Sequence, residues 1–209
     1  MKFYDYAAAP SPRRVRIFLA EKGITVPTVQ VDLRNCEQFS EAFRAINPDC
    51  TVPVLELDSG TRLTDPIGIC RYLEAVHPDP PLMGATPEEQ GVIEGWQRWA
   101  ERDGFYAVME AFRNWTRAFA KHALPGPDEY EQIPALAERG RMRVARFFER
   151  LDARLAGSEF VDGARYSVAD ITALITIDFA AWPKLVPPEN FRDLKRWLDA
   201  VNARPSAKA

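Results

Sequence analysis

Hydrophobic and polar positions alternate with the periods of both strands and helices up to about residue 80, and with the helical period alone after it. In the first part, short segments with the two-residue period of strands alternate with stripes at helical spacing. We expect strands over residues 2–6, 26–33, 54–57 and 61–63, and helices over residues 12–22, 37–46 and 66–76. This order of elements predicts an α/β unit with a parallel pair of strands followed by a hairpin.

A proline-rich linker divides the chain. Three prolines among the five residues His77–Pro81 force an extended and stiff connection. Beyond it only helical spacing remains. We expect helices over residues 88–121, 134–155, 167–179 and 191–201, and a frayed end over residues 204–209. The predicted fold class is therefore α/β plus all-α, with a thioredoxin-like βαβαββα domain over residues 1–80 and an all-helical domain over residues 86–209.

One helix of the second part is expected to be central. Ser167 is a capping hydroxyl, and Asp170 follows three residues later, as in a capping box. The body of this helix is apolar nearly all round, with Ile177 and Phe179 on nearly opposite faces and Ile171 between them. A helix of this kind is buried against neighbours on every side.

Composition and charge narrow the possible partners. The net charge of -3 argues against nucleic acid. No apolar run reaches the ~18 residues of a membrane span, and Asp5, Pro10 and Arg13 interrupt any apolar core of a signal peptide. The three cysteines are scattered without a C-x-x-C motif, which favours a reducing compartment and no metal site. We expect a cytoplasmic protein with no membrane or nucleic-acid partner.

Two short motifs indicate where a ligand binds. Pro53 opens a strand, and because proline donates no ladder hydrogen bond, the backbone at Val52 is left free to pair with something else. Asp65 and Pro66 begin a helix, whose first turn offers free N–H groups and the positive end of the helix dipole. Together these motifs predict one side of a cleft for an extended, peptide-like molecule that carries a carboxylate.

Three longer motifs carry a family resemblance. They are the proline-flanked R-R-V-R-I-F-L-A-E-K-G helix, the I-N-P-x-x-x-V-P-V-L segment from Ile46 to Leu55, and the S-x-A-D segment from Ser167 to Asp170. With the two-domain layout, the chain resembles cytosolic glutathione transferases over nearly its whole length. The resemblance implies glutathione as co-substrate, a hydrophobic electrophile as second substrate, no metal, and a homodimer.

The resemblance also implies how glutathione is held by the first motif. In the family, the peptide bond before the proline that matches Pro53 is cis. The backbone of the preceding residue, here Val52, pairs with the cysteinyl unit of glutathione. Gln38 lies in a polar segment where family members often contact the glycyl end. A solvated helix start is the alternative interpretation of Gln38.

The second motif departs from the family. Members commonly have an acid followed by Ser, and both bind the γ-glutamyl unit. Asp65 keeps the acid for the ligand's ammonium group, but Pro66 supplies neither a hydroxyl nor an N–H. Recognition of the carboxylate then depends on the N–H groups of Ile67 and Gly68. An Asp cap with Pro in the first turn also explains the pair without a ligand.

Catalysis requires that the glutathione sulfur be ionised, since the thiolate is the nucleophile. Many members have Ser, Cys or Thr at the position of Ala9, which has no donor. Ser11, two residues later, is our candidate catalytic residue. Alternatives are Tyr4 and Tyr6 at the end of the first strand. Ser11 also fits the role of a simple N-cap before Pro12.

The second substrate needs an apolar pocket. Tyr106, Phe112 and Trp115 are candidates for its lining, although aromatics at helical spacing also suit a core or a dimer interface. The favoured hypothesis is a glutathione S-transferase that conjugates the thiolate to hydrophobic electrophiles. A glutathione-dependent disulfide or peroxide reductase is a second hypothesis. A non-catalytic homologue that binds glutathione or a protein is the third, and Ala9 and Pro66 favour it.

Overall fold

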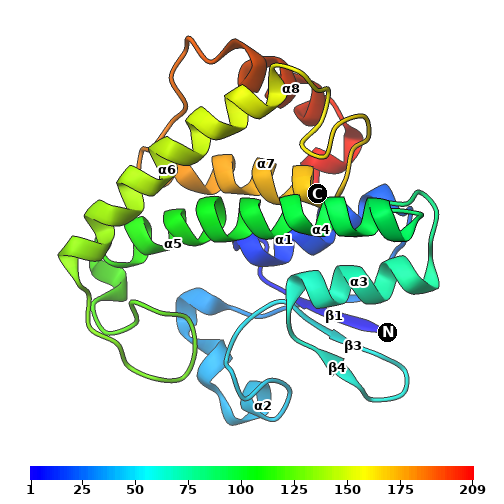
Figure 1. Ribbon diagram of the computed structural model, residues 1–209. Coiled ribbons are helices and arrows are strands. Elements are labelled where there is room, and N and C mark those ends of the chain that lie inside the picture. Colours follow the sequence, from blue (N-terminus) through cyan, green and yellow to red (C-terminus); the bar gives the residue numbers. More distant parts are fainter.

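The computed structural model describes all residues from 1 to 209. In Figure 1 the strands lie in the lower part of the molecule and the larger helical part lies above them. The N-terminal domain contains β1 (Lys2–Asp5), α1 (Pro10–Glu21), β2 (Thr28–Gln30), α2 (Glu41–Arg44), β3 (Val54–Glu56), β4 (Arg62–Leu63) and α3 (Pro66–Val76). The sheet order is β2-β1-β3-β4, with only the β1–β2 pair parallel. The expected thioredoxin-like order is confirmed.

The segment between β2 and β3 differs from the sequence prediction. β2 is only three residues long, because the Asp32 carboxylate accepts hydrogen bonds from the N–H groups of Arg34 and Asn35 and starts a 3-10 turn, η1 (Leu33–Asn35). The helix expected over residues 37–46 is broken in two, η2 (Glu37–Phe39) and α2. Ser40 divides them, since its hydroxyl accepts the N–H of Phe43 at 3.2 Å and caps a new helix.

The rest of the chain is helical, as expected. It contains α4 (Pro87–Trp99), the π-helical segment η3 (Ala100–Phe105), α5 (Tyr106–Arg113), η4 (Arg117–Phe119), α6 (Pro134–Leu155), α7 (Val168–Ala180), α8 (Arg192–Asn202) and η5 (Pro205–Lys208). α4 and α5 form one continuous rod across the middle of Figure 1. None of the helices is both long and apolar enough to cross a membrane.

The rod ends at Arg113, earlier than the predicted end at residue 121. The Arg113 guanidinium donates hydrogen bonds to the carbonyl oxygens of His122 at 2.5 Å and Leu124 at 3.0 Å. The Asn114 side chain accepts the N–H of Ile133 at 2.9 Å. Because these contacts draw the chain back onto the end of α5, residues 114–133 form a folded loop instead of further helical turns.

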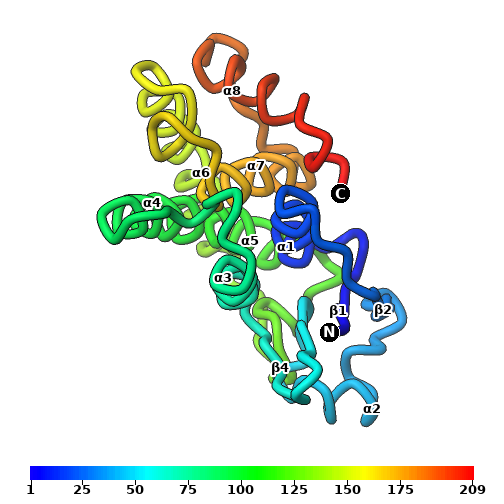
Figure 2. Tube along the Cα trace, turned by 90° about the vertical axis from the view of Figure 1, so that its right-hand side faces the viewer, coloured from blue at the N-terminus to red at the C-terminus, as the bar shows by residue number.

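α7 is the central helix, as its composition predicts. Every residue of α7 except Asp178 is buried. Its N-terminus has the expected capping box, and the Asp170 carboxylate also accepts the indole N–H of Trp197 at 2.8 Å. Figure 2 shows α1 of the N-terminal domain between α3 and α7. A single apolar cluster therefore runs through both domains, from Phe3 and Phe18 to Phe147.

The C-terminal residues are ordered, so the prediction of a frayed end is wrong. η5 packs against α1, and Ser206 and Ala207 are buried. The Arg204 guanidinium forms two hydrogen bonds with the Glu21 carboxylate, at 2.6 and 2.7 Å, and the Ser206 hydroxyl donates to the same carboxylate. Local periodicity did not indicate this order, because the stabilising partner lies more than 180 residues away along the chain.

Candidate functional site

The register of the sheet gathers three segments at one edge. Tyr4 of β1 pairs with Val54 of β3 in an antiparallel ladder, so the residues after β1 lie next to those before β3. Leu55 pairs with Leu63 of β4, so the residues after β4 reach the same edge. The edge therefore carries the loop into α1, the start of β3 and the start of α3. The predicted catalytic residue Ser11 and the predicted glutathione-binding residues Val52, Pro53, Asp65 and Pro66 belong to these segments, whereas Gln38 lies in η2.

α1 begins at Pro10, two residues before the predicted start at residue 12. Ala9 is the N-cap, so Ser11 is not the N-cap but the second helical residue. The fixed φ of Pro10 suits the first helical position, so the helix starts earlier in the sequence than predicted. Because Pro10 and Pro12 have no N–H, Ser11 carries the only N–H of the first three helical residues, and that N–H forms no backbone hydrogen bond. Ser11 thus offers an N–H and a hydroxyl at the positive end of the helix.

The start of β3 has the geometry that the resemblance implies. The Val52–Pro53 peptide bond is cis. The Val52 side chain is buried with Tyr4, Val31 and Phe43, which anchors the residue. The N–H and C=O of Val52 nevertheless take part in no backbone hydrogen bond. An extended ligand therefore finds an unpaired stretch of main chain beside the sheet.

The start of α3 offers fewer donors than expected. Asp65 is the N-cap, and its carboxylate accepts the N–H of Gly68 at 2.7 Å. The expectation that Gly68 contributes a free N–H is therefore wrong. Pro66 occupies the first helical position, so Ile67 holds the N–H that remains free of backbone partners. The exposed Asp65 carboxylate serves as a cap and still has one oxygen without a protein partner.

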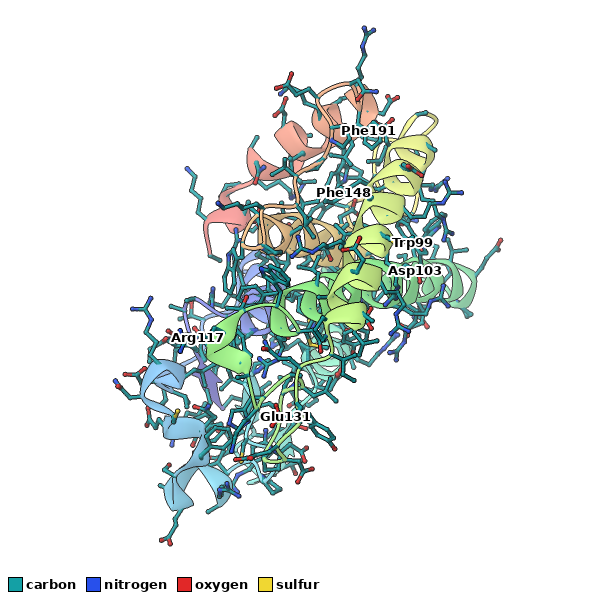
Figure 3. All side chains as sticks on the ribbon, turned by 90° about the vertical axis from the view of Figure 1, so that its left-hand side faces the viewer. Trp99, Asp103, Arg117, Glu131, Phe148 and Phe191 are labelled. Atoms are coloured by element: carbon teal, nitrogen blue, oxygen red, sulfur yellow. The ribbon has the colours of Figure 1, made fainter.

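A loop of the helical domain reaches the segment that contains Gln38. His122 stacks on Phe39, which follows Gln38 in η2. Figure 3 labels Arg117 and Glu131 near the two ends of this loop, where it comes down beside the N-terminal domain. The buried Oε1 of Gln38 and Nδ1 of His122 have no hydrogen-bond partner. The two domains therefore each contribute a residue with a buried, unpaired polar atom beside or within the Phe39–His122 contact.

An apolar cavity of about 60 Å³ lies between the start of α1 and the end of α7. Ala9 and Pro10 form one side, and Phe179 and Trp182 form the other. Arg13 and Asp178 lie at its polar margin, where the guanidinium and carboxylate pair at 2.5 Å. The absence of a side chain beyond Cβ at Ala9 thus helps to leave room between the two domains.

Comparisons with known proteins agree with this geometry. Residues 9–76 match the family described as glutathione S-transferase, N-terminal domain, and residues 105–205 match glutathione S-transferase, C-terminal domain. The chain is 37% identical to glutathione S-transferase 2 of Saccharomyces cerevisiae, with 100% of this chain and 88% of that protein covered. The chain belongs to the glutathione S-transferase family.

Solved structures of the family share its fold closely. A glutathione S-transferase domain-containing protein from Marinobacter aquaeolei superposes with a TM-score of 0.91 at 41% identity, over 99% of both chains. Gtt2 from Saccharomyces cerevisiae also gives a TM-score of 0.91, at 35% identity, over 100% of this chain and 99% of that one. The two-domain glutathione transferase architecture is therefore confirmed for this chain.

The three aromatic residues predicted for the second-substrate pocket of this family member are not brought together. Trp115 is 67% exposed and lies under the guanidinium of Arg141 at 5.0 Å. Phe112 packs edge-on against Phe179 and Trp182, so it lies behind two residues that line the apolar cavity. Tyr106 is partly exposed on α5, and burial, with the nearby Glu101 carboxylate, raises the pKa of its phenol.

The two tyrosines considered as alternatives to Ser11 differ in burial. Tyr4 is buried in a small apolar cluster with Val52 and Val54, and its ring packs edge-on against Phe43. Tyr6 is partly buried at the margin of the same cluster. Of the two phenols, Tyr6 is the less enclosed, and it directly precedes the loop into α1.

Sequence reasoning missed several residues of this site. Phe179 and Trp182 have the spacing of an ordinary core helix, and nothing in their periodicity indicates that they face the start of α1. His122 lies beside a helix break, where a local pattern predicts only a loop. The sequence does indicate a loop here, since His122 and a proline-glycine segment follow an aromatic helix. It does not indicate that this loop contacts the N-terminal domain.

Proposed function

We propose that this protein conjugates glutathione to hydrophobic electrophiles. The observation that supports this most directly is the unpaired backbone of Val52 beside a cis proline, at the same sheet edge as the starts of α1 and α3. The cysteinyl unit pairs with Val52, the ammonium group binds Asp65, and the γ-glutamyl carboxylate binds the N–H of Ile67. Gln38 contacts the glycyl end, and Pro53 shapes the turn that exposes Val52.

Ser11 is the proposed donor to the sulfur. Its N–H and O–H, together with the dipole of α1, stabilise the thiolate and lower the pKa of the bound thiol. The thiolate then attacks an electrophilic carbon, its lone pair forms the new S–C bond, and the leaving group departs with the electron pair of the broken bond. The electrophile approaches the sulfur over the mouth of the apolar cavity, where Phe179 and Trp182 offer an apolar surface with Phe112 behind them.

A glutathione-binding protein without transferase activity is the second candidate function. Two observations favour it: Ala9 offers no hydroxyl, and Pro66 removes both a hydroxyl and an N–H from the start of α3. One charge-assisted hydrogen bond contributes about 1.5–3 kcal/mol, so its loss weakens binding roughly ten- to hundredfold. Binding with slow chemistry is the expected behaviour of such a protein.

The experiment combines binding with two activity assays. Millimolar glutathione should raise the melting temperature, because a ligand that binds only the folded state stabilises it. Turnover of a chlorinated aromatic with glutathione supports conjugation. Activity only on the bis-glutathionyl disulfide supports the reductase hypothesis instead. A stabilised protein without either activity supports the second candidate, and no stabilisation at all overturns glutathione binding.

The proposal includes a homodimer in the reducing cytoplasm, which suits a chain with three free cysteines. α4 and α6 enclose a shallow hollow of about 440 Å³, lined in part by Trp96, Trp99 and the exposed Val92. We assign the subunit contact to this face. Val92→Asp should give monomers in sedimentation experiments, whereas Val186→Asp, at an exposed valine elsewhere, should leave the dimer intact.

A further inference from the structure

A buried ion pair joins the two domains directly beneath Ser11. The Arg14 guanidinium, on α1, lies 2.7 Å from the Glu101 carboxylate, and both side chains are almost fully enclosed, at 2% and 4% exposed. The second guanidinium N–H group of Arg14 donates to the Ser11 hydroxyl oxygen at 3.2 Å. One arginine thus connects a carboxylate of the helical domain to the candidate thiolate donor of the N-terminal domain.

The helical domain holds Glu101 in this position through unusual backbone. Glu101 lies in the π-helical segment η3, which interrupts the rod of α4 and α5. π-helical turns are rare and occur frequently at functional sites. The side chains of Glu101 and Phe105 both turn inward here, and the Arg14 guanidinium lies 4.3 Å from the centre of the Phe105 ring. The guanidinium is therefore fixed on two sides.

Stability alone explains this arrangement poorly. Removing two charges from water costs about as much as their attraction returns, so a buried pair is weak evidence for a stabilising role. The cost is higher here because the Nε of Arg14 is buried without a hydrogen-bond partner. An arrangement that is costly to fold but orients a neighbouring hydroxyl is better explained by positioning.

The direction of the hydrogen bond matters for chemistry. A hydroxyl has one donor and two acceptor positions. Since the Ser11 oxygen accepts from Arg14, the hydroxyl hydrogen is left to point elsewhere, and the orphan N–H of Ser11 lies at the same helix start. Donation by a cation also polarises the O–H bond and makes it a stronger donor to an anion.

We propose that Arg14, held by Glu101 across the domain boundary, is a positioning residue that directs the Ser11 hydroxyl toward the glutathione sulfur. The inference rests on the proposed glutathione-dependent function. It makes the helical domain a contributor to thiol ionisation, because the carboxylate that orients Arg14 belongs to that domain. The pair is thus a link between the docking of the two domains and the reactivity of the bound thiol.

The test measures the pKa of enzyme-bound glutathione, from the ultraviolet absorbance of its thiolate, in a double-mutant cycle. Arg14→Lys keeps the charge but loses the planar fork that reaches both partners. It should raise the pKa of the bound thiol by about one unit and lower kcat/KM near neutral pH about tenfold, with KM for glutathione little changed. Glu101→Gln should act in the same direction, and it decides the question if Arg14→Lys fails to fold.

The cycle is completed by Ser11→Ala. If Arg14 acts through Ser11, Arg14→Lys should have no further effect on the thiol pKa in the Ser11→Ala background. Arg204→Lys is the matched control, because Arg204 also forms an interdomain ion pair with α1, through Glu21, at the other end of that helix. It should leave the thiol pKa unchanged even if it lowers the melting temperature.

Two negative outcomes are distinguishable. A wild-type protein that binds no glutathione overturns the proposed function and this inference together. A wild-type protein that ionises the thiol, with an unchanged pKa in Arg14→Lys and Glu101→Gln, overturns only the positioning role. Equal effects of Arg14→Lys with and without Ser11 also contradict it, since the arginine would then act independently of the hydroxyl.

Discussion

Phe39 of the N-terminal domain and His122 of the helical domain stack on one another, with ring centroids 5.5 Å apart and ring planes inclined by 27°. The two residues are more than 80 positions apart, and their contact closes the loop after α5 over the segment that contains Gln38. Arg113 supports the loop from the other side through its bonds to the carbonyl oxygens of His122 and Leu124. The loop therefore borders the position at Gln38 where we propose that the glycyl end of glutathione binds.

Replacing His122 should weaken glutathione binding. An aromatic pair contributes about 0.5–1.5 kcal/mol beyond its buried area, so His122→Ala should raise the dissociation constant for glutathione roughly three- to tenfold. Isothermal titration calorimetry measures this directly. His122→Phe keeps the stacking on Phe39 and removes the unpaired Nδ1. Weak binding in both variants assigns the effect to Nδ1, and weak binding in His122→Ala alone assigns it to stacking. Unchanged binding in both contradicts the role of the loop.

Ser11→Ala should raise the pKa of the bound glutathione thiol. In the proposed complex the hydroxyl donates one hydrogen bond to the thiolate, which contributes about 1.5–3 kcal/mol, so the expected rise is about one to two units. Turnover near neutral pH should fall by a similar factor, while glutathione still binds. A thiolate titration and steady-state kinetics measure both effects. Unchanged kinetics would transfer the role to Tyr6 or to the free N–H of Ser11, which the substitution retains.

Pro66→Ser should strengthen glutathione binding. The start of α3 lacks a donor at this position, because proline has neither N–H nor hydroxyl, and Asp65 already occupies the N–H of Gly68. Serine restores an N–H and a hydroxyl for the γ-glutamyl carboxylate. A gain of about 1.5–3 kcal/mol corresponds to roughly ten- to hundredfold tighter binding. S-methylglutathione binding provides the measurement, and γ-glutamyl-free cysteinylglycine is the control ligand, whose affinity should not change.

The contact between α1 and the C-terminal residues should depend on pH. Burial raises the pKa of Glu21, but the hydrogen bonds from Arg204 and Ser206 outweigh it, so the pKa lies below its ordinary value of 4.5. A lowered pKa in the folded state stabilises the protein above pH 4.5, and this stability is lost as the pH falls through the folded-state value.

Glu21→Gln therefore should lower the free energy of unfolding near neutral pH and flatten its decline toward acid pH. Urea unfolding from about pH 6 to about pH 3 measures the slope. Glu149→Gln is the control, because Glu149 forms an ion pair with Arg146 on the exposed face of α6. An identical slope in Glu21→Gln and wild type would contradict the assignment.

Most elements of this fold were predictable because their signals are local. Prolines and capping residues mark the starts of α3, α6 and α7, and periodicity marks their buried faces. The same is true of the Val52–Pro53 motif, whose proposed role depends on its place in the order of elements. The errors fall where a distant partner decides the structure. Arg113 ends a helix that periodicity would continue, and Glu21 orders a tail that composition would leave frayed.

The candidate site was predictable only on the side that the N-terminal domain forms. Ser11, Val52 and Asp65 lie at element starts, where local rules apply. The residues of the helical domain that face them, such as Phe179 of α7 and Glu101, belong to helical segments whose patterns specify a buried side but not the neighbour buried against it. Glu101 is the clearest case, since a charged residue at a buried position is inconsistent with its local pattern until Arg14 is known.

Packing between α5 and α6 gives a last prediction, at Gly140. A Cβ at this position would lie 2.6 Å from the backbone nitrogen of Ala111 and 2.8 Å from the carbonyl oxygen of Ala107, and backbone atoms cannot move aside as a side chain can. Gly140→Ala gains up to about 1 kcal/mol of helix propensity, but overpacking costs about 1–3 kcal/mol. Urea unfolding should therefore show a net loss. Gly157→Ala, just beyond α6 with nothing within 4 Å, should be neutral or slightly stabilising. Equal behaviour of the two variants would mean that the helices separate easily, and the close contact of α5 with α6 would not limit stability.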